Sequence, residues 1–231
     1  MTQAFHGFPN QTLTFLARLE KHNDREWFKA HRSDYEAFVL SPAREYVAAM
    51  GARLQSIVPG IQAIPTVDKS IFRMHRDTRF SADKRPFKTH IGIFIWEGDD
   101  NKLECPGFYL HLEKDKLRIG GGIHIFSKPL LTQYRAAVDD EKLGRRLVSV
   151  LKEGRRYFTD DRDSDTYKQI PRGYAKDHPR AELLKKKGLT FGETVSIPEV
   201  LHTPAVLDYV YERFERILPL HKWLREMKAR D

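Results

Sequence analysis

The sequence contains one cysteine, Cys105, among 231 residues. A single thiol excludes a disulfide framework and a cysteine-rich zinc site, and it fits a reducing compartment. No run approaches the ~20 consecutive apolar residues that a membrane span needs. Residues 1–10 lack the basic and apolar regions of a secretory signal. We therefore expect a cytoplasmic protein without a membrane partner.

Several catalytic motifs are also missing. The chain has no Gly-Lys-Ser/Thr phosphate loop, no Gly-x-Ser-x-Gly elbow and no His-Glu-x-x-His helix. His90, His111 and His124 fall on three expected strands, yet their spacing matches no local metal motif, so hydrogen-bonding histidines are the favoured interpretation. The acidic residues of 160–165 lack the glycine and final glutamate of a calcium loop. We predict no metal site, and the sequence identifies no cofactor.

The apolar residues, 40% of the chain, suffice for a real core and follow two different periods. Helical spacing covers residues 9–58, with Asn23 or Asp24 as one N-cap and Ser41 as another. Alternation then predicts strands at 87–96, 106–113 and 116–126, with a hairpin at 114–115. Residues 127–231 indicate helices and loops, an edge strand at 189–196 and a helix broken near Pro219. The prediction is a single α+β domain over residues 1–231. Its mainly antiparallel sheet, with the sheet core at residues 70–126, packs on N- and C-terminal helices.

The densest charge lies in residues 73–88, which hold six Lys or Arg and two Asp. This local surplus of four is half of the formal +8 of the whole chain. Arginine presents a planar fork of donors that matches phosphate or carboxylate, and Asp77 and Asp83 can each orient a guanidinium. Two interpretations stay open: an anion site, or a structural network of ion pairs that fixes a loop.

Strand alternation places a polar set on one sheet face, next to this segment. The set comprises Lys88, His90, Tyr109, His111, Arg118, Gly120, Gly122 and His124. Gly120, Gly121 and Gly122 are compatible with close approach of a ligand to the backbone, although a bulge or tight bend is the favoured explanation of the glycines alone. Tyr174, His178 and Arg180 are a possible lid over the expected groove.

The segment resembles the signature of an uncharacterised family, a domain of unknown function in bacteria and fungi. That signature, Arg-x-x-Arg-Asp-x-Arg-Phe followed by Asp-Lys-x-Pro-Tyr-Lys, corresponds to residues 73–80 and 83–88, with Phe87 in place of the usual tyrosine. The similarity covers nearly the whole chain and implies no activity.

These observations predict an enzyme or binder of a small phosphorylated or otherwise anionic ligand. The expected anion-binding residues are Arg73, Arg76, Arg79, Lys84, Lys88, Arg118 and Gly120–Gly122. The candidate catalytic residues are His90, His111, His124, Asp77 and Asp83. One alternative is a non-catalytic nucleic-acid-binding module, in which Phe80, Phe87, Tyr109 or Trp96 stacks on bases. The other is a structural arginine–aspartate network without a ligand.

Overall fold

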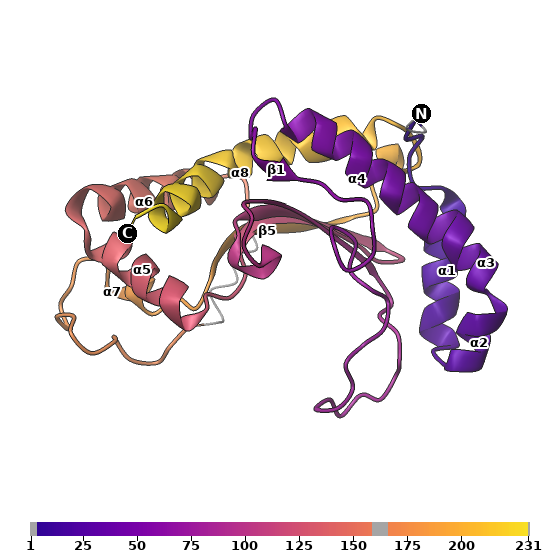
Figure 1. Ribbon diagram of the computed structural model, residues 1–231, viewed down its shortest axis with the longest axis horizontal. Helices are drawn as coiled ribbons and strands as arrows, with labels where there is room; N and C mark the ends of the chain where they lie inside the picture. The colour runs from indigo at the N-terminus through magenta and orange to yellow at the C-terminus, as the bar shows by residue number, and fades with distance from the viewer. Residues whose placement is uncertain (1–3, 159–165, 231) are drawn as a thin grey trace. The chain divides into compact units, whose positions relative to one another are not determined.

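The computed structural model describes residues 4–158 and 166–230 and divides the chain into two compact units, which we treat separately (Figure 1). The first unit comprises Met1–Ile95, Tyr109–Ile119 and Thr194–Glu212. The second unit comprises Trp96–Phe108, Gly120–Glu193 and Arg213–Asp231. The expectation of one domain over 1–231 stays a prediction.

Five antiparallel strands form one sheet in the order β1-β2-β3-β4-β5. They are β1 (Ile61–Gln62), β2 (Ile91–Glu97), β3 (Gly107–Leu112), β4 (Lys116–Ile123) and β5 (Leu189–Ser196). A bond from the Glu113 amide to the Lys116 carbonyl (2.9 Å) closes the predicted β3–β4 hairpin. With helices in the N- and C-terminal parts of the chain, the α+β prediction is confirmed.

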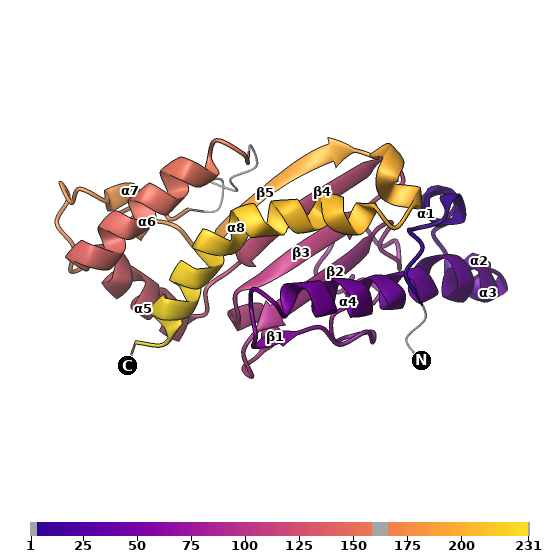
Figure 2. The same cartoon turned by 90° about the horizontal axis from the view of Figure 1, so that it is seen from above.

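The helices of the first unit begin at the N-terminus of the chain. They are α1 (Asn10–Lys21), α2 (Arg25–Ala30), α3 (Arg32–Tyr35), a π-helical turn (Glu36–Leu40) and α4 (Ser41–Leu54), which runs beside β1 and β2 (Figure 2). Asp24 is the N-cap of α2, accepting from the Trp27 amide at 2.8 Å. The prediction of Ser41 as an N-cap is wrong, because the π turn leads into α4 and leaves Ser41 in helical conformation. The buried Thr12 hydroxyl donates to the Phe38 carbonyl within that turn (2.5 Å).

The second unit is built mainly from helices. They are α5 (Lys128–Asp139), α6 (Glu141–Gly154), α7 (Ala181–Leu184) and the part of α8 (Val206–Lys228) after residue 212. Short 3₁₀ turns at Lys102–Glu104 and, in the first unit, Glu199–His202 complete the helical elements. The predicted break near Pro219 is wrong, since α8 continues through it. Its neighbours Ile217 and Leu220 are fully buried, and this packing outweighs the hydrogen bond that proline cannot donate.

The strand predicted from residue 87 begins at Ile91 instead. Residues 86–88 pair with residues 74–76: the Arg76 amide donates to the Pro86 carbonyl (2.8 Å), and the Lys88 amide to the Met74 carbonyl (2.7 Å). These bonds close residues 73–88, here called the arginine loop, which Figure 1 shows extending from the strands of the first unit on the side away from α4. Lys88 and His90 therefore precede the strand on which alternation placed them.

Candidate functional site

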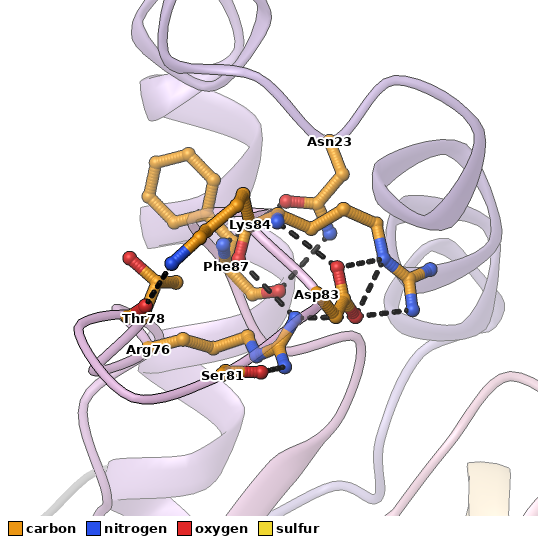
Figure 3. A network of polar contacts seen from close by, with 8 residues as sticks. Asn23, Arg76, Thr78, Ser81, Asp83, Lys84 and Phe87 are labelled. Atoms are coloured by element: carbon orange, nitrogen blue, oxygen red, sulfur yellow. Dashed lines mark hydrogen bonds and ion pairs between the residues drawn. The ribbon is translucent and has the colours of Figure 1, made fainter.

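The base of the arginine loop is fastened to the corner between α1 and α2. The Asn23 side chain donates to the Phe87 carbonyl and accepts from the Phe87 amide, both at 3.0 Å (Figure 3). The Phe87 ring is buried and stacks on Phe28, with centroids 4.2 Å apart. Phe87 is therefore a core residue, and Asn23, predicted only as an alternative helix cap, anchors the loop.

Asp83 joins two arginines inside the loop. Its carboxylate accepts from the Arg76 guanidinium at 2.6 Å and from the Arg85 guanidinium at 2.7 Å (Figure 3). Arg76 also donates to the Arg85 carbonyl (3.3 Å) and reaches the Ser81 hydroxyl at 3.5 Å. Hydrogen bonds from Arg85 first, and then from Arg76, lower the pKa of Asp83. This part of the predicted anion site is occupied by the chain's own carboxylate.

Asp77 and Arg79 form a second, local pair at the tip of the loop. Asp77 accepts from Arg79 through both oxygens, at 3.0 and 2.7 Å, and these bonds lower its pKa to about 2. Lys84 donates to the Thr78 carbonyl at 3.0 Å. Arg79 is 78% exposed in this pair, so the pair orders the tip without burying its charge.

Arg73 and Lys88 differ from the other cations of the loop. Among the residues that the structure describes, neither forms an ion pair or a hydrogen bond through its side chain. The half-buried Lys88 ammonium lies over the Phe72 ring, 5.5 Å from its centroid. Burial is the main cause that lowers the pKa of Lys88; Arg73 adds to the effect and Asp68 opposes it.

Two histidines stack beside Lys88. The His90 and His111 rings lie 4.0 Å apart at 23°. Burial, helped by His111 and Lys88, lowers the pKa of His90 to about 3, so this ring is neutral at physiological pH. The structure thus brings together Arg73, Lys88, His90 and His111 from the predicted site.

Tyr109, His111 and Glu113 form a continuous hydrogen-bonded row at the C-terminal end of β3. The Tyr109 hydroxyl lies 3.0 Å from His111 Nδ1, and His111 Nε2 lies 2.8 Å from the Glu113 carboxylate. The Phe72 ring meets Tyr109 edge to face at 6.2 Å, which connects this row to Lys88. Glu113 was not among the predicted residues, although it continues the alternation of residues 109 and 111 by one step.

Arg118 and the three glycines of the predicted anion site lie on β4. Arg118 is half-buried on β4 in the first unit. The space beside Gly120 and Gly122 is filled by β5 backbone at residues 189–192. Gly121 faces the Gly107 carbonyl and the Ile217 side chain. Gly122 has a φ of +125°, a conformation that favours glycine. The close approach that the glycines indicated is made by neighbouring segments of the second unit itself.

The possible lid residues also lie in the second unit. Arg180 is buried and donates to the Val138 (2.6 Å) and Asp139 (2.9 Å) carbonyls at the end of α5. His178 contacts the Asp139 carboxylate at 3.1 Å, and Tyr174 packs against His178. These contacts join the three residues to the end of α5, and their role as a lid stays a prediction. His124 is exposed after β4, and a groove that joins these residues to the arginine loop stays a prediction.

Residues 4–158 and 166–230 hold neither a metal cluster nor a membrane span. In these ranges no three His, Cys, Asp or Glu side chains are grouped so that they could hold a metal ion. Likewise, no helix of the described residues has the length and apolar character to cross a membrane. The acidic cluster Asp160, Asp161, Asp163 and Asp165 lies outside the described residues.

A family model described as "Conserved hypothetical protein (DUF2461)" matches residues 11–223. The chain belongs to this family. The DUF2461 match includes the arginine loop and the row on β3. A search of curated proteins finds no match.

Proposed function

We propose that the protein binds a small phosphorylated or otherwise anionic ligand through Arg73 and Lys88, beside the polar end of β3. The proposal is narrower than the predicted site, because Arg76, Arg79 and Lys84 already have partners within the loop. Arg76 holds the loop in shape through Asp83. Among the described interactions, Arg79 and Lys84 make only local contacts within it. The ligand contacts fall to the two cations without such partners.

The half-buried Lys88 ammonium is the observation that carries the proposal. Taking a charge out of water costs free energy unless a partner compensates for it. Arg73 adds like-charge repulsion, and the Phe72 ring and Asp68 offset the cost only in part, since the pKa of Lys88 remains lowered. A phosphate between Arg73 and Lys88 would remove both penalties.

Thermal shift with inorganic phosphate, pyrophosphate and AMP tests the proposal. A ligand at 100 times its Kd stabilises the folded state by ~2.7 kcal/mol, which is readily measured. Lys88→Met should abolish the shift and leave the unliganded melting temperature unchanged or higher, because it removes a poorly compensated charge and keeps an apolar stem.

Lys84→Met is the matched control, since Lys84 is exposed and bonds only to the Thr78 carbonyl among the interactions described. It should retain the shift. The proposal fails if none of the three probes shifts the wild type, or if Lys88→Met keeps the full shift.

Binding of single-stranded nucleic acid is a second candidate, favoured by one observation. Phe80 is 95% exposed at the tip of the loop, with the Arg79 guanidinium 5.8 Å from its ring centroid. An exposed aromatic ring beside cations is suited to stacking on a base. Fluorescence anisotropy with a labelled oligonucleotide should then show affinity that falls steeply with salt and drops in Phe80→Ser. Binding that is insensitive to Phe80→Ser excludes this candidate.

A further inference from the structure

We propose that Tyr109, His111 and Glu113 form a general-base relay that activates water against a phosphoester held by Arg73 and Lys88. The inference rests on the proposed function and adds an activity to it. The Tyr109 hydroxyl is the end of the relay that meets the water, and Glu113 is a positioning residue at the other end.

The direction of the relay follows from which atoms can donate. A carboxylate accepts only, so His111 Nε2 carries the proton in its 2.8 Å contact with Glu113. In the neutral ring Nδ1 is then the unprotonated nitrogen, and the Tyr109 hydroxyl donates to it across 3.0 Å. Tyr109 can therefore pass its proton to His111 while its oxygen takes one from water.

The chain holds this row rigidly. Tyr109 and His111 lie on the same face of β3, two residues apart. The hydrogen bond that closes the β3–β4 hairpin fixes the Glu113 backbone. Gly92 leaves room for the phenol, because a Cβ there would lie 3.1 Å from the Tyr109 hydroxyl oxygen.

The surroundings also favour transient charge on His111. His90 stacks on its ring and is neutral, its pKa being lowered to about 3, so it does not repel an imidazolium. The Glu113 carboxylate stabilises that imidazolium directly. The His111 side chain is 18% exposed, which limits competition from bulk water, and Tyr109 is only partly buried.

The step balances as a hydrolysis. The water oxygen forms a bond to phosphorus and the P–O bond to the leaving group breaks. The water proton moves to the Tyr109 oxygen as the Tyr109 proton moves to His111 Nδ1, and the imidazolium then loses its extra proton to solvent. With p-nitrophenyl phosphate the leaving group departs as p-nitrophenolate and needs no proton.

The experiment compares hydrolysis of p-nitrophenyl phosphate with binding of phenylphosphonate, which cannot be hydrolysed. Tyr109→Phe and Glu113→Gln should each lower kcat on the order of 100-fold, the usual contribution of general-base catalysis. KM and phenylphosphonate affinity should stay within about twofold, because neither residue holds the phosphate in this scheme. Glu113→Asp should restore part of kcat, whereas Tyr157→Phe, at an exposed tyrosine of the second unit, should change nothing.

Each of the other outcomes contradicts either the relay or both the relay and the proposed function. Wild-type turnover equal to that of Tyr109→Phe, with phenylphosphonate still bound, overturns the relay and leaves the proposed function standing. Loss of phenylphosphonate binding in Tyr109→Phe also overturns it, because Tyr109 is then a ligand contact. A wild type that neither binds phenylphosphonate nor turns over p-nitrophenyl phosphate overturns both.

Discussion

Two histidine–glutamate pairs in the described part of the chain have the same 2.8 Å contact and opposite surroundings. His111 and Glu113 lie on the polar face of the first unit, with side chains 18% and 44% exposed. His221 and Glu97 lie in the core of the second unit, at 0% and 4%, where Phe108 stacks on the imidazole. The same two residue types therefore have different roles in the two units. The burial of each pair and the hydrogen-bond partner of the histidine Nδ1 determine that role.

In the buried pair, His221 Nδ1 has no hydrogen-bond partner among the residues that the structure describes. Burial lowers the pKa of His221 even though Glu97 opposes the shift. A ring that is neutral and enclosed cannot exchange a proton with a ligand. In the open pair Nδ1 bonds to the Tyr109 hydroxyl, which extends the hydrogen-bonded row to a third, partly buried residue. The comparison separates a structural pair from one that is suited to proton transfer.

Removing the glutamate from each pair should give the largest contrast. Glu97→Ala leaves a buried His221 without its acceptor and deprives Arg225 of its ion pair, so unfolding should become easier by ~3–5 kcal/mol. Glu113→Ala breaks a half-exposed contact and should cost ~0–1 kcal/mol. Urea unfolding of both variants measures the difference, and equal losses would contradict the distinction between the pairs.

The pH dependence of the free energy of unfolding tests whether His90 and His221 are neutral in the folded protein. The folded pKa of His90, about 3, lies below its ordinary value of 6.5, so between these values only the unfolded chain binds the proton. Stability is then full above pH 6.5 and declines as pH falls toward 3, with a slope of at most ~1.4 kcal/mol per pH unit for this group. His221, also lowered, contributes with the same sign.

Unfolding in urea at pH 7, 6 and 5, above the range in which most carboxylates titrate, measures this slope. His90→Gln should flatten it by up to one proton while the contribution of His221 remains. A wild type that gains stability between pH 7 and 5 would show that these histidines are charged in the fold, contrary to their surroundings.

The sequence predicted the parts of the fold that depend on local pattern. Alternation in residues 106–113 and 116–126 located β3, β4 and their hairpin, because one face of each strand is buried. It placed the start of β2 at residue 87, since the pairing of residues 86–88 with residues 74–76 depends on backbone contacts that no side-chain period encodes. The helix break predicted at Pro219 is wrong for a related reason, because the burial of its neighbours in α8 is a tertiary effect.

The candidate site was predictable to a similar extent. The charge surplus of residues 73–88 points to this segment, but only its three-dimensional contacts distinguish Arg73 and Lys88, which have no carboxylate partner among the described residues. Asn23 bonds to the Phe87 backbone 64 residues away, so no local sequence pattern predicts this contact. Glu113, by contrast, was within reach of the alternation that found Tyr109 and His111.

The two aspartates of the arginine loop differ in how far along the loop their arginine partners lie. Asp83 connects Arg76 with Arg85 near the base, whereas among the described residues Asp77 bonds only to the neighbouring Arg79. Asp83→Asn should therefore loosen the loop and speed hydrogen exchange of the Arg76 and Lys88 amides, which close its base. Asp77→Asn should leave both amides protected, because its pair does not reach the base. Since the pKa of Asp83 is lowered, the wild-type protection should persist down to pH 3.8 and decline only below it. Equal exchange in the two variants would mean that the base is held by Asn23 and the backbone bonds alone.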